Sequence, residues 1–290
     1  GYTPSRDAAL SITQWVTNYY EGDGTLLGAL LALKNSETPG LKNVKTGKYP
    51  LDRGTGNYIQ ALLDRFELLG NFSDVEMVGH IIRNTISTSD RFELLSDVEN
   101  AWFYTVLLQA VCRFITLKLQ LQQYDEDYQY ASKSIVHYAS WMAENEYAYL
   151  DKPEILEFPS QTWSGQDLRK ICILRFVASF LDEATKSTAI AKAEAWEKIV
   201  ADRLSSNVES VSTRVLCLIM QNSNFMAYQN ASEFVKNSDF KENIPLSNLK
   251  HNSSTPAKYL FKHVKRFSWG RERSQLVKRF PQFQKWLGKP

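Results

Sequence analysis

Apolar residues recur at helical spacing along most of the chain, and this repetition limits the possible folds more than any other feature. In residues 6–20, for example, Ala9, Ile12 and Trp15 are three residues apart. Spacing of three to four residues places side chains on one face of an α-helix, whereas the alternation typical of strands is almost absent. We therefore predict an all-α protein.

The predicted helices form successive pairs joined by short turns. The pattern repeats about every 45–55 residues, a period that indicates stacked helical hairpins in a solenoid or a closed toroid. We expect Ser73 to cap the second helix of the first pair. The predicted pairs are 55–69 with 73–86, 97–122 with 127–145, and 164–181 with 186–204, flanked by helices at 6–20, 25–34 and 209–221 and a short one at 231–236.

Two of these helices have a character that favours the toroid. Residues 101–119 and 168–181 are apolar nearly all round, whereas their partner helices are apolar on one side only. A helix that is apolar all round is buried on all sides. We therefore expect an inner and an outer ring of helices, an alpha/alpha toroid of helical hairpins. About five hairpins are present, so the ring is expected to be incomplete or closed by the C-terminal tail, with a superhelical solenoid as the alternative.

Charge is distributed unevenly along the chain, whose net charge is +2. Residues 241–290 contain 12 Lys and Arg but only 2 Asp and Glu, while the first 240 residues carry a net charge of −8. This division predicts a helical-hairpin toroid over 1–240 and a basic, aromatic tail over 241–290, docked on the same domain. Helical spacing of Tyr259, Phe261 and Val264 favours a packing role for these tail side chains.

Other features limit the environment and the cofactors. No apolar run approaches the roughly 20 residues that cross a bilayer, and no basic-then-apolar leader is visible, so we expect no transmembrane segment and favour a cytoplasmic protein. Because the chain does not begin with methionine, truncation of the N-terminus stays open. Cys112, Cys172 and Cys217 lack metal-ligand spacing, so we expect buried thiols, no metal and no cofactor.

Three segments with similar chemistry precede the predicted inner helices. They are 49–58 (YPLDRGTGNY), 94–104 (LLSDVENAWFY) and 157–170 (EFPSQTWSGQDLRK), each with acids, aromatic residues and amides or small residues. In a toroid of helical hairpins, such loops open into one common funnel. We therefore predict a site formed by these segments.

The residue types in these segments suit a sugar pocket, because aromatic rings stack on pyranose faces and carboxylates or amides bind hydroxyls. Paired carboxyl groups about 5 Å or about 6.5–9.5 Å apart cleave glycosidic bonds. Asp52, Glu99 and Asp167 are the catalytic candidates; a lyase would instead use Tyr58, Tyr104 and Arg53. The substrate-binding candidates are Arg53, Asn57, Tyr58, Trp102, Gln161, Trp163 and Gln166.

Helix capping explains several of the same residues without any function. Asp52 or Thr55 is suited to cap the helix that follows, as is Asp97 or Ser96 in the second segment. In the third segment, Ser164 and Asp167 match a helix-start signature, which would place Trp163 beside Leu168 as a hydrophobic staple. The glycines of DRGTGN lack the Lys-Ser/Thr of a phosphate loop.

Three stretches also resemble a known class of proteins. LDRGTGNYIQALL, residues 99–110 and PEILEFPSQTWSGQDLRK look like parts of bacterial alpha/alpha-toroid proteins of the six-hairpin, glycosidase-like class. The resemblance covers residues 49–181 and implies a role with polysaccharides.

Two function classes follow from these observations. The first is a carbohydrate-active or carbohydrate-binding toroid, a glycoside hydrolase or lyase if active, with an oligo- or polysaccharide as partner. The second is a non-catalytic helical-repeat protein whose basic tail contacts an anionic partner. For the tail we expect no nucleic-acid reader, while peripheral membrane contact stays an alternative. A terpenoid-cyclase-like toroid is disfavoured because the acidic YDEDY lies in a predicted turn.

Overall fold

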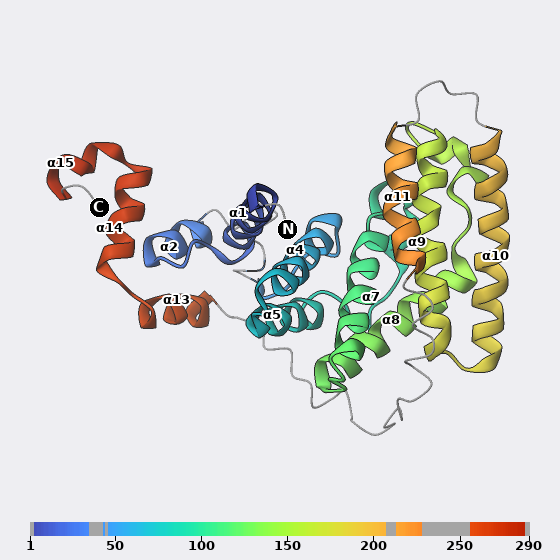
Figure 1. Ribbon diagram of the computed structural model, residues 1–290, viewed down its shortest axis with the longest axis horizontal. Helices are drawn as coiled ribbons and strands as arrows, with labels where there is room; N and C mark the ends of the chain where they lie inside the picture. The colour runs from blue at the N-terminus through green and yellow to red at the C-terminus, as the bar shows by residue number, and fades with distance from the viewer. Residues whose placement is uncertain (1–2, 35–42, 44–45, 207–212, 228–255, 288–290) are drawn as a thin grey trace. The chain divides into compact units, whose positions relative to one another are not determined.

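The structure is a computed structural model that describes residues 3–34, 43, 46–206, 213–227 and 256–287. Every regular element in these residues is helical and none is a strand, so the prediction of an all-α protein is confirmed (Figure 1). The short helix expected at 231–236 lies outside the described residues. No helix in the described ranges combines the length and the apolar character needed to cross a membrane.

The chain divides into two compact units. Unit 1 comprises residues 1–50, 61–85 and 250–290, and unit 2 comprises residues 51–60 and 86–249. Helix α4 (Arg53–Leu69) is therefore divided between them. The domain boundary expected at residue 240 lies outside the described residues, and the described part of the tail belongs to the same unit as the N-terminal helices.

Unit 1 joins the two ends of the chain. Helix α13 packs on α2, where Tyr259 meets Ala29 and Ala32 in a small apolar core. The Tyr259 hydroxyl also donates to the carbonyl of Glu21 at 3.0 Å. Besides part of α4, the helices of unit 1 are α1 (Thr3–Glu21), α2 (Leu26–Lys34), α5 (Phe72–Arg83), α13 (Pro256–Lys265), α14 (Trp269–Arg279), η8 (Pro281–Phe283) and α15 (Gln284–Leu287).

The turn between α1 and α2 depends on glycine. Gly22 and Gly24 have φ angles of 79° and 77°, which lie in the left-handed region where residues with a side chain are strained. A Cβ on Gly22 would also lie 2.5 Å from the hydroxyl of Tyr259. The sequence EGDG therefore ends α1 and leaves room for the C-terminal segment.

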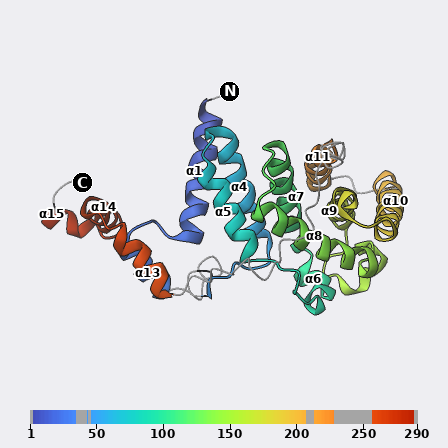
Figure 2. The same cartoon turned by 90° about the horizontal axis from the view of Figure 1, so that it is seen from below.

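Unit 2 is organised around α9 (Gln161–Val177), which contacts α7 (Tyr104–Gln120), α8 (Glu126–Asn145), α10 (Glu183–Ser205) and α11 (Thr213–Ala227) (Figure 2). Of the 17 residues of α7, 14 are buried, and α9 has 13 buried residues. The expectation that these two helices are buried nearly all round is confirmed. The remaining elements of unit 2 are η2 (Glu93–Ser96), α6 (Val98–Ala101), η3 (Tyr149–Asp151), η4 (Pro153–Ile155) and η5 (Ala178–Phe180).

By contrast, α10 buries a single stripe. Its buried residues are Ala189, Ala193, Trp196 and Val200, which recur at steps of three or four. Its N-cap Asp182 accepts hydrogen bonds from the amides of Ala184 and Thr185, so α10 begins where the sequence supplies a capping carboxylate. This one-sided burial agrees with the sequence pattern.

Several expected helix starts are wrong by a few residues. Asn71, not Ser73, is the N-cap of α5, because its carboxamide oxygen accepts from the Ser73 amide. Helix α9 begins at Gln161, so Ser164 and Asp167 lie inside the helix and Trp163 does not precede its cap. The helix expected over 97–122 is interrupted at Trp102 and Phe103, between α6 and α7.

Candidate functional site

The segment before α4 uses its acid as a cap. Asp52 is half-buried, and its Oδ1 accepts a hydrogen bond of 2.8 Å from the amide of Thr55. Arg53 and Asn57 are exposed, whereas Tyr58 is fully buried and faces no solvent. Of the sugar-binding candidates in this segment, only Arg53 and Asn57 are therefore freely accessible.

In the second and third segments, two candidate tryptophans lie together. The rings of Trp102 and Trp163 have centroids 6.0 Å apart and pack edge to face, and Tyr149 packs on Trp163 at 5.3 Å. Trp163 is buried and donates from Nε1 to the carbonyl of Phe158, while Trp102 is half-buried. We call Trp102, Tyr149 and Trp163 the aromatic cluster.

The edge of the aromatic cluster carries one candidate acid. Glu99, on α6, is half-buried and accepts from the amide of Glu157 at 3.4 Å. Ile155 and Phe158, which follow η3, are exposed apolar side chains of the same loop. The structure thus brings the second and third segments together, through Glu99 and Glu157 and through the two tryptophans.

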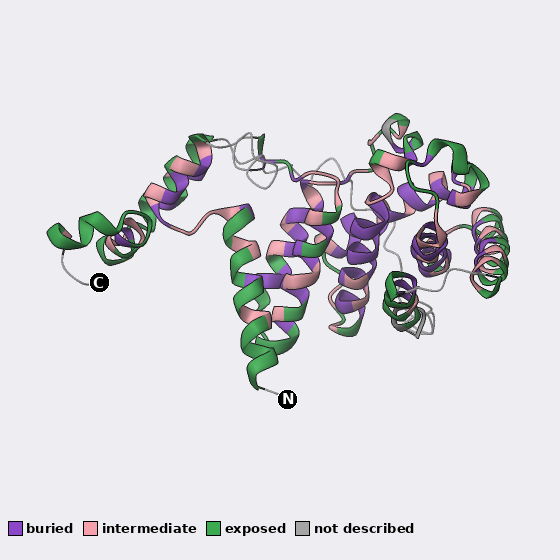
Figure 3. Ribbon diagram, turned by 90° about the horizontal axis from the view of Figure 1, so that it is seen from above, coloured by how far each residue is buried: buried purple, intermediate pink, exposed green. Residues whose placement is uncertain are grey.

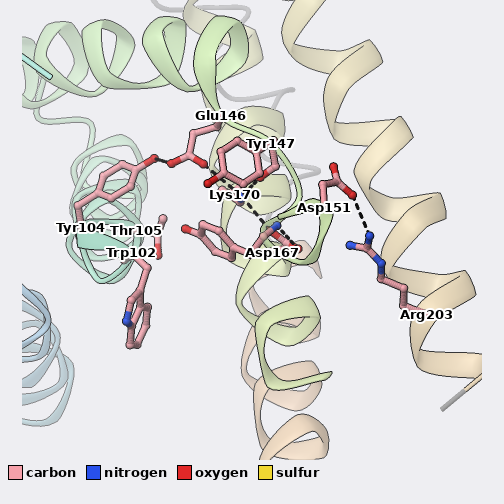
Figure 4. A network of polar contacts seen from close by, with 10 residues as sticks. Trp102, Tyr104, Thr105, Glu146, Tyr147, Asp151, Asp167, Lys170 and Arg203 are labelled. Carbon is pink, nitrogen blue, oxygen red and sulfur yellow. Dashed lines mark hydrogen bonds and ion pairs between the residues drawn. The ribbon is translucent and has the colours of Figure 1, made fainter. Parts of the chain in front are cut away.

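Asp167 lies behind Tyr149 of the aromatic cluster, in a buried network of charges (Figure 4). Its side chain is 0% exposed, and its carboxylate is 2.8 Å from Nζ of Lys170, which is also 0% exposed. Both oxygens of Asp167 also accept from the backbone amide of Tyr149, at 3.2 Å each. Asp167 therefore does not face solvent.

Glu146, at the end of α8, is the second acid of the buried network. One of its oxygens is 3.3 Å from Nζ of Lys170, and the other accepts a hydrogen bond of 2.7 Å from the hydroxyl of Tyr104 on α7. In Figure 4, Glu146 accordingly lies between Tyr104 and Lys170. Nζ of Lys170 also donates to the carbonyl of Tyr147.

Aromatic rings enclose the lysine at the centre of the network. Nζ of Lys170 lies 3.5 Å from the ring centroid of Tyr149 and 4.7 Å from that of Trp196 on α10. A cation held over ring faces in a dry site gains electrostatic energy that partly offsets its loss of water. Lys170 thereby links α8, α9 and α10.

Burial sets the protonation preferences of this network. Loss of water raises the pKa of Asp167 above its ordinary value, although Lys170 and the Tyr149 amide act in the opposite direction. Burial likewise raises the pKa of Tyr104 well above its usual value, and the neighbouring Glu146 adds to the effect. Tyr104 is therefore a neutral hydrogen-bond donor and not a base at neutral pH.

A second polar group surrounds the buried Arg169 with amide side chains. Its guanidinium donates to the side-chain oxygens of Gln166, at 2.8 Å, of Gln221, at 2.9 Å, and of Gln109. Gln109 in turn donates to Asn222 at 2.7 Å. Gln166, a substrate-binding candidate, is thus buried and bonded to Arg169.

The last of the substrate-binding candidates is Gln161. Gln161, at the start of α9, is half-buried and accepts from the hydroxyl of Ser164 at 3.0 Å.

Cys112 and Cys172 are buried as expected, and burial raises the pKa of Cys172 to about 12. Cys217 is exposed, so its expected burial is wrong. In the described part of the chain, no three His, Cys, Asp or Glu residues lie close enough to hold a metal.

Each candidate acid has its own partner: Thr55 for Asp52, Glu157 for Glu99, and Lys170 for Asp167. The sequence interpretation missed Glu146, Tyr104 and Lys170 as members of one network. The spacing of Asp167 and Lys170, three residues apart on one helix, was the local signal that an ion pair forms there. Glu146 and Tyr104 carried no such signal.

Unit 1 contains a cleft of about 470 Å³ between the α1–α2 turn and α14. Asp23 in its wall is bonded to the amide and hydroxyl of Thr25 and lies 3.0 Å from Arg279. Lys278 also lines the cleft. Leu31 and Ala32 give the cleft apolar walls as well, and its acid is already engaged.

The outer surface of the C-terminal helices is basic and apolar at once. Of residues 256–287, nine are Lys or Arg and one, Glu272, is acidic. Glu272 is buried and caps α2, since its oxygens accept from the amides of Leu26 at 2.6 Å and Leu27 at 3.1 Å. We call the exposed side chains of α13, α14 and α15, with the residues between them, the C-terminal cationic surface.

Comparison with known proteins adds no identification. No protein-family model matches this chain, and no curated protein or solved structure matched it. The resemblance to six-hairpin toroid proteins therefore stays a prediction.

Proposed function

We propose that this protein is a non-catalytic helical interaction protein that binds an anionic partner through the C-terminal cationic surface. The observation that carries the proposal is that nine basic residues of 256–287 are accompanied by one acid, and that this acid is buried as the cap of α2. Positive charge is therefore in excess over this segment, although Arg279 is paired with Asp23. Such a surface attracts anionic partners through long-range electrostatics.

The arrangement of the candidate acids favours binding over catalysis. A catalytic carboxylate has to reach the proton or the reacting atom of its substrate. Asp167 is 0% exposed and is held by Lys170, while Asp52 caps α4. The ion pair of Asp167 and the capping bond of Asp52 are structural roles, and they account for both acids without catalysis.

The test is binding to heparin, a soluble polyanion, by the full chain at increasing salt concentration. Replacing Lys265, Arg271 and Lys278 with Glu is expected to weaken binding at least tenfold, because the reversals change the charge of the surface by six. A matched control reverses Lys34, Lys48 and Lys198, which are exposed outside the surface. Equal losses in both variants, or no binding of the unaltered protein at low salt to any polyanion or anionic vesicle, would overturn the proposal.

A second candidate function is glycan binding at the edge of the aromatic cluster, in a protein with the alpha/alpha-toroid fold. Such a protein would either cleave the bound glycan or only bind it. It is favoured by the half-buried Trp102 beside Glu99, with the exposed Phe158 in the adjoining loop. An aromatic face next to a carboxylate suits the apolar face and the hydroxyls of a sugar ring. In this proposal the inner and outer helix rings would be those expected from the sequence.

Tryptophan fluorescence titrated with cello-, chito- and malto-hexaose tests the second candidate. We expect a saturable change that Trp102→Ala abolishes and that the control Trp15→Ala, on α1, retains. A response that is unaltered in Trp102→Ala would rule this site out.

A further inference from the structure

Helix α13 has two apolar sides, and only one of them is used within unit 1. Tyr259 and His263 are buried, with Tyr259 in the core against α2. Since successive residues of a helix are about 100° apart, Phe261 and Val264 lie on the other side. They are 59% and 51% exposed. The sequence interpretation assigned both to packing, and the described residues do not cover them.

The exposed aromatic side chains continue beyond α13. Phe267 and Trp269 are 52% and 62% exposed, and Trp286 on α15 is 86% exposed. In Figure 3, α15 and much of α14, near the C label, have the colour of exposed residues. Single exposed apolar residues are ordinary on a protein surface, but a run of them along consecutive helices marks a binding surface.

Cations are interleaved with these rings. Lys262, Lys265 and Arg266 are exposed next to Phe261 and Phe267, and Arg271 and Lys278 lie seven residues apart on the exposed side of α14. Nζ of Lys265 lies 4.7 Å from the ring centroid of Phe261. The surface therefore presents apolar rings and positive charges to the same partner.

We propose that this partner is the surface of an anionic lipid bilayer, an inference that rests on the proposed function and specifies its partner. Helices that lie in a bilayer interface place Phe, Trp and Leu among the acyl chains and Lys and Arg among the headgroups. Each Lys or Arg near an anionic bilayer adds to the attraction. A soluble polyanion would satisfy the cations and leave Phe261, Val264 and Trp286 in water.

The experiment measures co-sedimentation of the full chain with vesicles of phosphatidylcholine alone and with 30% phosphatidylglycerol. We expect at least tenfold stronger binding to the anionic vesicles. Trp269→Ala and Trp286→Ala are each expected to weaken this binding at least threefold. The matched control is Trp15→Ala on α1, because Trp15 is 68% exposed in the same unit but lies outside the cationic surface.

A second readout detects insertion directly. Phosphatidylcholine brominated on its acyl chains should quench the tryptophan emission, and Trp286→Phe should bind as tightly but show less quenching. Each variant also keeps its charge, so heparin binding should be unchanged in all of them.

The outcomes separate this inference from the proposed function. Binding to heparin without binding to vesicles, or vesicle binding that is insensitive to Trp269 and Trp286, would overturn the lipid inference and leave the anionic partner standing. Failure to bind either probe would overturn both. Self-association that is lost in Phe261→Ser, without vesicle binding, would show that a second copy covers this surface instead.

Discussion

At the scale of single residues, Lys170 is the side chain on which unit 2 depends most. It is fully buried, and it neutralises two acids from different helices, Asp167 on α9 and Glu146 at the end of α8. Burying three charges is costly, so the network is held by its mutual pairing and by the hydrogen bonds from Tyr104 and the Tyr149 amide. Removing one member leaves the others uncompensated.

Lys170→Met is therefore expected to lower the free energy of unfolding by about 3–5 kcal/mol, as found when one partner of a buried ion pair is removed. Urea unfolding followed by circular dichroism at pH 7 measures the change. Lys198→Met, an exposed lysine of α10, is the control and should shift stability by less than about 0.5 kcal/mol. A similar small change for Lys170→Met would show that the network contributes little.

Asp167 should also make stability depend on pH in an unusual direction. Burial raises its pKa above 3.8, so the folded protein binds this proton more tightly than the unfolded chain does. The contribution of this group is then greatest below pH 3.8 and is lost as pH rises through the raised pKa. Relative to Asp167→Asn, the unaltered protein should lose stability as pH rises above 3.8, measured by urea unfolding at several pH values.

Asp182 serves as a control, because its effect on stability should change with pH in the opposite direction. Hydrogen bonds from the amide and hydroxyl of Thr185 and from the Ala184 amide lower its pKa below 3.8. Its contribution is present above pH 3.8 and is lost as pH falls through the lowered pKa. Relative to Asp182→Asn, the unaltered protein should therefore gain stability as pH rises, and slopes of the same sign for both variants would contradict the assignment.

At the scale of helices, Gly56, the second glycine of DRGTGN, acts in packing. A Cβ on Gly56 would lie 2.9 Å from the backbone nitrogen and Cα of Leu107, so α4 and α7 approach each other closely at this position. Both residues belong to unit 2. The glycine that suggested a ligand loop is thus explained by contact between two backbones.

Gly56→Ala is expected to destabilise unit 2 by about 1–3 kcal/mol, the usual cost of forcing a group into a packed interior. Gly270→Ala, on α14, is the matched control, because nothing lies within 4 Å of its added Cβ. That change should be neutral or stabilising by up to about 1 kcal/mol, since alanine favours helix more than glycine does. Thermal unfolding of both variants distinguishes the two cases, and equal effects would argue against the close approach.

At the scale of the whole molecule, the first and last segments of the chain fold as one unit. Glu272 caps α2, although it is 246 residues away from Leu26. A carboxylate at the N-terminus of a helix satisfies free amides and interacts favourably with the helix dipole. The basic tail is thus anchored to the N-terminal helices while its outer surface stays exposed.

Glu272→Ala should lower the stability of unit 1 by about 1–2 kcal/mol, as the loss of other helix caps does. Hydrogen exchange at the amides of Leu26 and Leu27 measures it locally, and both should exchange faster. Glu194→Ala, on the exposed side of α10, is the control. Unchanged exchange at these two amides would show that the contact does not hold α2.

Much of the fold could be predicted from the sequence because it depends on local pattern. Helical periodicity predicted the helices, and the all-round apolar character of α7 and α9 predicted their burial. Capping by Asp52 also followed from local chemistry, since the acid lies three residues before the amide it accepts from. The predicted start of α9 was wrong because it was placed at a serine suited to capping, Ser164, whereas the helix begins after Ser160, whose side chain makes no capping hydrogen bond.

The candidate site was less predictable, because exposure depends on residues far away in sequence. The type and spacing of Asp167 suit an open carboxylate as well as a buried one. Only its contacts with Lys170 and the Tyr149 amide in the folded protein show that it is buried. Trp102 and Trp163 come from two of the three segments expected to share a site, and their rings are in contact.

The sequence by itself determined the helices, their apolar faces and the division of charge between an acidic body and a basic tail. Each of these depends on residues close together in the chain. Tertiary structure alone decided which charges are buried and which apolar side chains stay exposed, as it did for Lys170 and for Trp286. The physical reason is that burial depends on the surfaces that pack against a residue, and these come from distant parts of the chain.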